Sequence, residues 1–105
     1  MESTEGHFII GQVVRHVLFD YRGVIFDVDP CFSGTQDWYV QVARSKPPKD
    51  KPWYHVMVND EIHTTYVAER HLEVDKSGRP IKHILLGSVF GSFVNGVYIP
   101  KLRTN

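Results

Sequence analysis

The chain has 105 residues, of which 42% are hydrophobic, and this composition predicts one folded domain with a single modest core rather than a disordered chain. The formal net charge is zero, which excludes a surface that is basic on all sides. The single cysteine excludes an internal disulfide, and with no signal-peptide pattern and no run of eighteen apolar residues we expect a cytoplasmic protein that does not enter a membrane.

The charges are distributed unevenly along the chain. All twelve acidic residues lie at or before Asp75, where seven basic residues accompany them, so this part has a net charge of −5. The five basic residues that follow Asp75 have no acidic neighbour and give +5. The asymmetry indicates an acidic body with a basic end that a partner could recognise.

Two strands are predicted in the first thirty residues, after a disordered N-terminus at residues 1–7. The segment FIIGQVVRH predicts the first strand, with Gly11 as a bulge or as the point where the strand begins. The second ends at Pro30 and alternates strictly, which is typical of a half-buried strand. The alternation predicts one face with Val24, Phe26 and Val28 and another with Ile25, Asp27 and Asp29.

A short helix and a proline-rich loop are predicted next. Trp38 and Val42 stand at helical spacing in the segment DWYVQVARS, and Ser33 or Thr35 could cap a helix of about two turns. The following segment, SKPPKDKP, has three prolines, which exclude a regular helix or strand. We therefore expect an extended, exposed loop there.

The segments WYHVMV and IHTTYVA are rich in aromatic and β-branched residues and predict a hairpin. The loop between them leaves two registers open. In one, His55 pairs with Tyr66, and His55 and His63 face opposite sides of the sheet. In the other, His55 pairs with Thr65, and the two histidines share one face.

The C-terminal part predicts one more short strand, HLEV, and then an amphipathic helix in HILLGSVFGSFVNG. Leu85, Val89 and Phe93 recur every four residues, as on one face of a helix, and Asn95-Gly96 would end it. The domain would then span residues 8–95, and residues 96–105 would form a basic tail.

Together these elements predict a mainly β fold. Four or five short strands separated by turn signals are typical of a small, bent, antiparallel, SH3-like β-barrel, here with one or two short helices packed against it.

The residues give no pattern typical of a catalytic or metal centre. The histidines do not stand at zinc-binding spacings, so we expect no metal and no cofactor, and interpret His55 as a histidine hydrogen-bonded among aromatic residues. Asp27 and Asp29 could share a proton or a cation, or form a solvated strand face. Cys31 follows a proline in a turn with no adjoining glycine-rich elbow, so we expect no enzyme activity.

Three groups of residues are candidates for binding. Aromatic side chains could form a stacking or cation–π surface, although a small domain also needs them in its core. Basic side chains could contact DNA phosphates, and the tail could be a flexible handle for another protein. The aromatic candidates are Tyr21, Trp53, Tyr54 and Tyr66; the DNA candidates are Arg15, Arg22, Arg44, Lys46, Lys49 and Lys51; and the tail candidates are Tyr98, Lys101, Leu102 and Arg103.

Four blocks, GQVVRH, DYRGVIFDVDP, PWYHVMV and TTYVAERHL, follow one another at specific spacings between Gly11 and Leu72. In this order they resemble the HspQ family, also called the YccV-like or hemimethylated-DNA-binding domain. The resemblance implies a small cytoplasmic, stress-induced β-barrel without catalytic activity. It also implies two kinds of partner: AAA+ proteases of the Lon or ClpXP type with their client proteins, and hemimethylated double-stranded DNA.

Two hypotheses of function follow. In the first, the protein is a non-enzymatic heat-shock accessory factor that tethers denatured client proteins to an ATP-dependent AAA+ protease and so raises the effective concentration of the client. In the second, it is a DNA-binding module that prefers hemimethylated sites. Exposed strand edges and the apolar C-terminal segment also predict a homo-oligomer.

Overall fold

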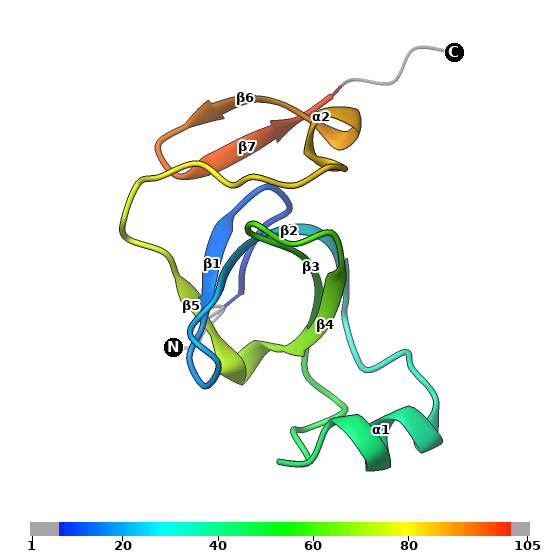
Figure 1. The fold of residues 1–105 in the computed structure, drawn as a ribbon. Coiled ribbons are helices and arrows are strands. Elements are labelled where there is room, and N and C mark those ends of the chain that lie inside the picture. The colour runs from blue at the N-terminus through cyan, green and yellow to red at the C-terminus, as the bar shows by residue number, and fades with distance from the viewer. Residues whose placement is uncertain (1–6, 102–105) are drawn as a thin grey trace, which may run out of the picture.

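Five short strands form one antiparallel sheet in the computed structural model, which describes residues 7–101 (Figure 1). The order in the sheet is β4-β3-β2-β1-β5, so β4 and β5 lie at its two edges. The sheet curls around its own inner face, which confirms the predicted mainly β, barrel-like fold. The strands are β1 (Val13–His16), β2 (Arg22–Asp29), β3 (Trp53–Val58), β4 (Thr64–Ala68) and β5 (Leu72–Val74).

The inner face of the curled sheet holds the first of two cores. Its buried members are apolar side chains from all five strands, with the ring of Tyr54 among them. Phe8, Tyr21 and Val28 cover the margins of this core. Its buried residues are Val14, Ile25, Tyr54, Val56, Val67 and Leu72.

The strict alternation predicted for β2 is wrong, because a β-bulge at Phe26 interrupts it. Ile25 lies opposite Val56 and Asp27 lies opposite His55, so Phe26 has no partner on β3. Because of this extra residue, Ile25 and Val28 both contact the inner core although they are three positions apart. Asp27 and Asp29 still share the outer face, as predicted.

The β3–β4 hairpin is confirmed, with the register that pairs His55 with Tyr66. Alternate residues of a strand point to the same face, so Trp53, His55 and Met57 all lie on the outer face of the sheet. His63 lies opposite Val58 and therefore on the other face. The two histidines of the hairpin are thus separated by the sheet.

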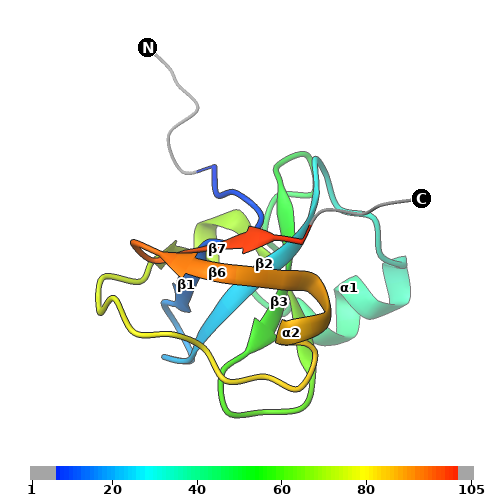
Figure 2. The same ribbon diagram turned by 90° about the horizontal axis from the view of Figure 1, so that it is seen from above.

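A second, two-stranded sheet covers part of this outer face and builds the second core (Figure 2). It consists of β6 (Phe90–Val94) and β7 (Val97–Pro100), and the hairpin runs across β1, β2 and β3 when it is seen from above. The short helix α2 (Leu86–Val89) leads into it. The buried residues between the layers are Val13, Val24, Met57, Ile81, Phe90 and Tyr98.

The predicted C-terminal helix is therefore wrong apart from the four residues of α2, and so is the tail that was expected from residue 96. Asn95 and Gly96 have positive φ angles of 51° and 81° and connect β6 to β7, which is the geometry of a two-residue hairpin turn. Helical spacing of apolar residues misled the interpretation, because the chain buries Phe90 and Tyr98 from a hairpin instead.

Gly11 joins the two layers. Its φ angle is +96°, and a Cβ atom there would lie 1.9 Å from the carbonyl oxygen of Tyr98. The close approach allows Tyr98 N–H to donate to the Gly11 carbonyl at 2.6 Å, while Gly11 N–H donates to Ile25 at 2.7 Å. Glycine is required here both for the backbone angle and for the contact.

The predicted short helix is confirmed as α1 (Gln36–Val42), with the Thr35 hydroxyl accepting from Trp38 N–H at 3.1 Å as its N-cap. A 3₁₀ turn, η1 (Glu69–His71), connects β4 to β5. No helix of residues 7–101 is long and apolar enough to cross a membrane. The expected disorder of residues 1–7 falls, except for His7, outside the described residues.

Candidate functional site

A cavity of about 720 Å³ opens along β4. All five residues of β4 line it, together with residues from the β1–β2 turn, from α1 and the loop that follows, from β3 and from η1. The segments that form its walls are far apart in the sequence. Lining residues outside β4 include Leu18, Phe19, Trp38, Val42, Arg44 and His55.

An aromatic cluster forms the wall of the cavity beside α1. Trp53 is only 1% exposed, and its ring centroid lies 5.2 Å from that of Tyr66 and 4.9 Å from that of Phe32. Trp38 of α1 contacts both Trp53 and Tyr66 edge-on. The cluster fixes α1 against the outer face of β3 and β4.

The four aromatic candidates divide between binding surface and core. Tyr21, Trp53 and Tyr66 line the cavity. Tyr54 is buried in the inner core, where its hydroxyl donates to Glu69 at 2.8 Å and accepts from Phe8 N–H at 3.1 Å. Burial is the main reason why its pKa is raised to about 12. Tyr54 is therefore a structural residue.

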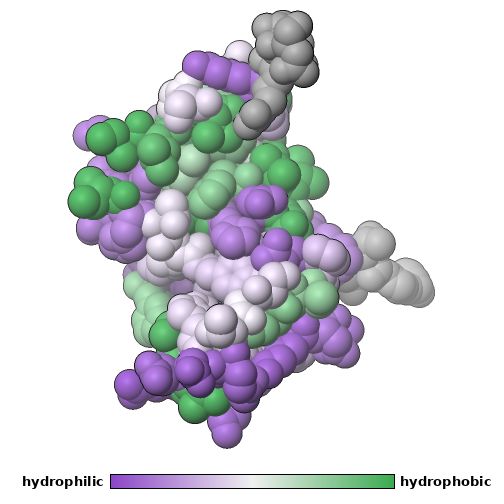
Figure 3. Space-filling model, turned by 90° about the vertical axis from the view of Figure 1, so that its right-hand side faces the viewer, coloured by the Kyte–Doolittle hydropathy of each residue, from purple (hydrophilic) through white to green (hydrophobic). Residues whose placement is uncertain are grey.

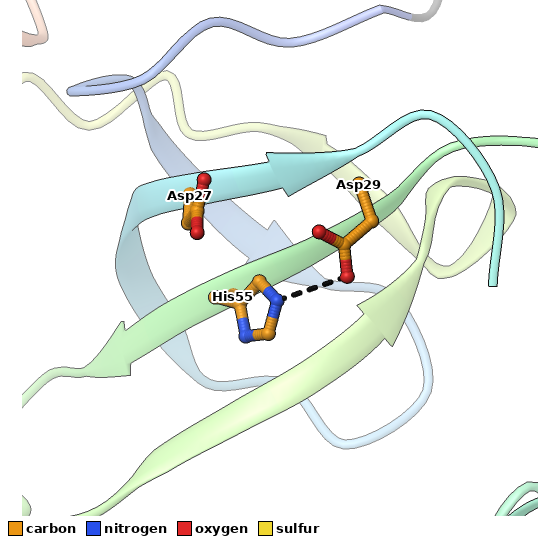
Figure 4. Close-up of side chains that lie close together, drawn as sticks. All are labelled: Asp27, Asp29 and His55. Carbon is orange, nitrogen blue, oxygen red and sulfur yellow. Dashed lines mark hydrogen bonds and ion pairs between the residues drawn. The ribbon is translucent and has the colours of Figure 1, made fainter. Parts of the chain in front are cut away.

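His55, Asp29 and Tyr66 form a hydrogen-bonded group at one side of the cavity. Asp29 points towards the His55 ring across the β2–β3 ladder (Figure 4), with Nε2 of His55 3.1 Å from Oδ2 of Asp29. The same Oδ2 accepts the Tyr66 hydroxyl at 2.7 Å. This bond from Tyr66 is the largest cause of the lowered pKa of Asp29, while burial, followed by the bond to Asp29, raises the pKa of Tyr66 to about 12.

Asp27, Asp29 and His55 are the described residues that could hold a metal ion. Each offers one ligand atom, and these atoms lie within 4.8 Å of one another. Three protein ligands of mixed oxygen and nitrogen type would suit a divalent transition metal with open positions. However, Asp29 is already bonded to His55 and Tyr66, and Asp27 accepts from Val28 N–H at 2.9 Å. These hydrogen bonds account for the arrangement without an ion.

Two of the six DNA candidates have other roles. Arg22 is mostly buried, pairs with Asp75 at 3.2 Å and donates to the carbonyl of Arg79. Arg15 pairs with Asp20 at 2.7 Å and with Glu73 at 2.5 Å. Both guanidinium groups are engaged in holding strands and turns together.

The other four lie on one segment, the loop between α1 and β3. Arg44, Lys46, Lys49 and Lys51 are all exposed, and none pairs with an acidic side chain of residues 7–101. Lys49 donates to Gln36 and lies 4.3 Å from the centroid of the Tyr39 ring. The loop is thus a basic surface that remains available to a partner.

This loop is held in place rather than loose. Pro47 is fully buried, its carbonyl accepts the Tyr39 hydroxyl at 2.6 Å, and the Pro48 carbonyl accepts the Trp53 indole N–H at 3.0 Å. Arg70 also donates to the Ser45 carbonyl at 2.9 Å. The loop is exposed at most of its positions, as predicted, but its burial at Pro47 and these hydrogen bonds were not predicted.

The two tail candidates that the structure describes lie in different surroundings. Tyr98 is buried in the outer core, where its hydroxyl accepts from Ile81 N–H at 2.9 Å. Lys101 is exposed and donates its backbone N–H to the Val89 carbonyl at 2.9 Å. Leu102 and Arg103 lie outside the described residues. Cys31 is exposed, on the turn after β2.

The sequence interpretation missed the contribution of the β1–β2 turn to the cavity. Leu18 and Phe19 line it although they are 60% and 74% exposed. His16 holds this turn, because its Nδ1 accepts the backbone N–H groups of both residues at 3.1 Å. Two large apolar residues in a turn were a signal that could have been noticed, since turns are usually polar.

Polarity differs between the two ends of the molecule. On the face in Figure 3, hydrophilic residues gather at the bottom, over α1 and the following loop, and hydrophobic residues gather higher, at the level of α2. Exposed apolar side chains near α2 include Ile84 and Leu85. Exposed apolar side chains of this kind are consistent with the predicted homo-oligomer, which stays a prediction.

The chain was compared with models of protein families. The sequence profile described as "Hemimethylated DNA-binding protein YccV like" matches residues 6–97, which is most of the chain. It covers the five-stranded sheet, α1, the basic loop and β6, and ends at the first residue of β7. The chain therefore belongs to the YccV-like family, as the four blocks between Gly11 and Leu72 predicted.

Proposed function

We propose that the protein is a non-enzymatic cytoplasmic module that binds duplex DNA through the basic loop between α1 and β3. The observation that carries this proposal is the group of four exposed basic side chains on a loop anchored at Pro47. An anchored loop loses little conformational entropy when it docks, and unpaired basic side chains exchange counterions on phosphates. The family description supports the same function.

Preference for hemimethylated DNA requires an apolar contact in addition to phosphate contacts, because a methyl group is read at the base edge in a groove. Val40 of α1 is 58% exposed and lies only four residues before the first basic side chain of the loop. It is our candidate for this contact. Replacement of Val40 by serine should reduce the preference for hemimethylated over fully methylated duplex and leave the phosphate contacts intact.

The test is a mobility-shift series at several salt concentrations. Each phosphate contact contributes about −0.9 to the slope of log K against log salt, so Lys46→Ala and Lys51→Ala should each make the slope shallower by about 0.9. Lys76→Ala, which removes an exposed basic residue outside the loop, should leave the slope unchanged. A flat salt response of the wild-type protein would exclude DNA binding through phosphate contacts, and equal affinity for all methylation states would exclude the preference for hemimethylated DNA.

A second candidate is the accessory role in proteolysis, and the cavity along β4 favours it. A tethering factor needs one surface for the client protein and another for the AAA+ protease. The cavity shares Arg44 with the basic loop, but Lys46, Lys49 and Lys51 do not line it, so the two surfaces could serve these two purposes.

Degradation of a denatured client by a purified Lon-type or ClpXP-type protease, with and without this protein, tests the role. Stimulation should be largest at low client concentration, where tethering matters most. Because Tyr98 belongs to the core, a deletion that tests the C-terminal end must spare it and remove only residues 102–105. No stimulation with either protease would argue against the role.

A further inference from the structure

The free edge of β4 offers backbone groups that no other strand uses. Glu69 N–H donates to the Pro52 carbonyl and Val58 N–H donates to the His63 carbonyl, which makes residues 63, 65, 67 and 69 the ones that bond to β3. The N–H and C=O groups of Thr64, Tyr66 and Ala68 therefore point away from β3. Within residues 7–101, these groups take no part in loop, turn or side-chain hydrogen bonds.

The two edges of the sheet differ in how well they are protected. β5 has only three residues, and its exposed Glu73 is held by Arg15. Short length and charge are the usual protection of an edge strand. β4 has five residues, TTYVA, with no charge and no proline. It is the edge on which another chain can add a strand.

Apolar side chains stand on both sides of this edge. Val42 of α1 is 57% exposed and lines the cavity on the outer side of the sheet. Leu18 and Phe19 of the β1–β2 turn line it on the inner side, where Thr65 and Val67 point. An added strand directs alternate side chains to opposite faces, and both faces would meet apolar surface here.

The charge of the lining favours a partner with a carboxylate. Arg44 and three histidines line the cavity, and none of the described lining residues is acidic. The pKa values of His16 and His71 are lowered, mainly by burial, which disfavours a positive charge on either ring. Arg44 is the permanently charged basic side chain in the lining, and it has no ion pair within residues 7–101.

We propose that the β4 edge and this cavity bind an extended polypeptide segment as an additional strand, with apolar side chains in the cavity and a carboxylate on Arg44. The five residues of β4 set the paired length at about five residues of the partner. A nucleic-acid strand has no regular row of amides to pair with this edge. The inference does not depend on DNA binding, and it would supply the client site that the second candidate function requires.

Backbone amide resonances of the ¹⁵N-labelled protein report the contact. The probe is an eight-residue peptide of alternating valine and threonine with one central glutamate. Two control peptides carry N-methyl groups on alternate amides, one in each phase, so that they keep the side chains and lose one row of hydrogen bonds. We expect shifts and slower hydrogen exchange at Thr64, Tyr66 and Ala68 with the unmodified peptide, and loss of binding with one of the N-methylated peptides.

Two variants locate the site. Ala68 has a φ angle of −68°, which suits proline, and its N–H points to the free edge. Ala68→Pro should therefore keep the β3–β4 ladder and weaken peptide binding at least about tenfold. Arg44→Ala should weaken binding about tenfold through the lost charge-assisted hydrogen bond. Arg79→Ala, an exposed arginine outside the cavity, is the matched control and should bind normally.

Four results would overturn the proposal. The first is that the β4 amide resonances do not shift with the unmodified peptide, and the second is that all three peptides bind equally well. The third is that the β4 resonances shift with duplex DNA but not with peptide. The fourth is that the protein forms a dimer that Ala68→Pro abolishes and does not bind the peptide. If Ala68→Pro fails to fold, two comparisons still test the proposal. One compares peptide binding by Arg44→Ala and by Arg79→Ala, and the other compares the unmodified peptide with the N-methylated peptides. The mobility-shift series tests DNA binding separately, so either function can fail alone.

Discussion

Replacement of Gly11 by alanine should be the most damaging small change in the protein. The new Cβ would lie 1.9 Å from the Tyr98 carbonyl oxygen and 3.0 Å from its carbon, and both atoms are backbone that no side-chain rotation can move. A φ angle of +96° costs an L-residue about 1–3 kcal/mol. The two hydrogen bonds of Gly11 contribute about 1 kcal/mol each and would be distorted.

We therefore expect Gly11→Ala to lower the free energy of unfolding by about 3–4 kcal/mol and Tm by more than about 10 °C. Urea denaturation followed by tryptophan fluorescence measures the change, since Trp53 is buried. Gly78→Ala is the control, because Gly78 has a φ angle of +72° but no atom within 4 Å of the added Cβ. It should cost only about 1 kcal/mol of backbone strain. Equal losses in the two variants would refute the contact between the layers.

Three further predictions concern buried polar groups. Tyr98→Phe should cost about 1–3 kcal/mol in urea denaturation, because the buried N–H of Ile81 loses its acceptor, and an unchanged stability would contradict that bond. Asp29 has a lowered pKa, first through the bond from Tyr66, so its contribution to stability is present above its unfolded value of 3.8 and is lost as pH falls below that. Stability between pH 5 and 2 should consequently fall less steeply in Asp29→Asn than in the wild type, and parallel curves would count against this. His16 has a pKa lowered from 6.5 by burial, so stability should fall as pH drops below 6.5; His16→Gln should flatten that part of the curve, and a wild-type curve already flat there would show that His16 is not kept neutral.

Local signals predicted those parts of the fold that local chemistry decides. The hairpin of β3 and β4 is dense in aromatic and β-branched residues, and Thr35 caps α1 through its own side chain. The bulge at Phe26 was not predictable, because it depends on how β2 fits β3 and leaves no mark in the composition of β2.

The C-terminal hairpin shows how two patterns can compete in one segment. Leu85, Val89 and Phe93 fit a helix, but Asn95-Gly96 is also the strongest short signal of a two-residue hairpin turn. The outer core decided between them, because only a hairpin places Phe90 and Tyr98 over Met57. Tertiary packing of this kind cannot be read from a window of a dozen residues.

The candidate site was predictable only in part for a similar reason. The basic loop is one continuous segment, so its charge is visible in the sequence. The cavity is assembled from separate segments, and neither the exposure of Phe19 nor the free edge of β4 has a local signature. Arg22 looked like the basic loop residues in sequence, and only its partner Asp75 distinguishes it.

The contact between Gly11 and Tyr98 also sets an order of assembly. The inner core needs nothing beyond Leu72, whereas the outer core closes only when Phe90 and Tyr98 arrive. Val24 and Met57, on the outer face of the five-stranded sheet, stay uncovered until the β6–β7 hairpin packs over them. Any state in which the hairpin is detached would expose this apolar face, and transiently exposed apolar surface promotes aggregation.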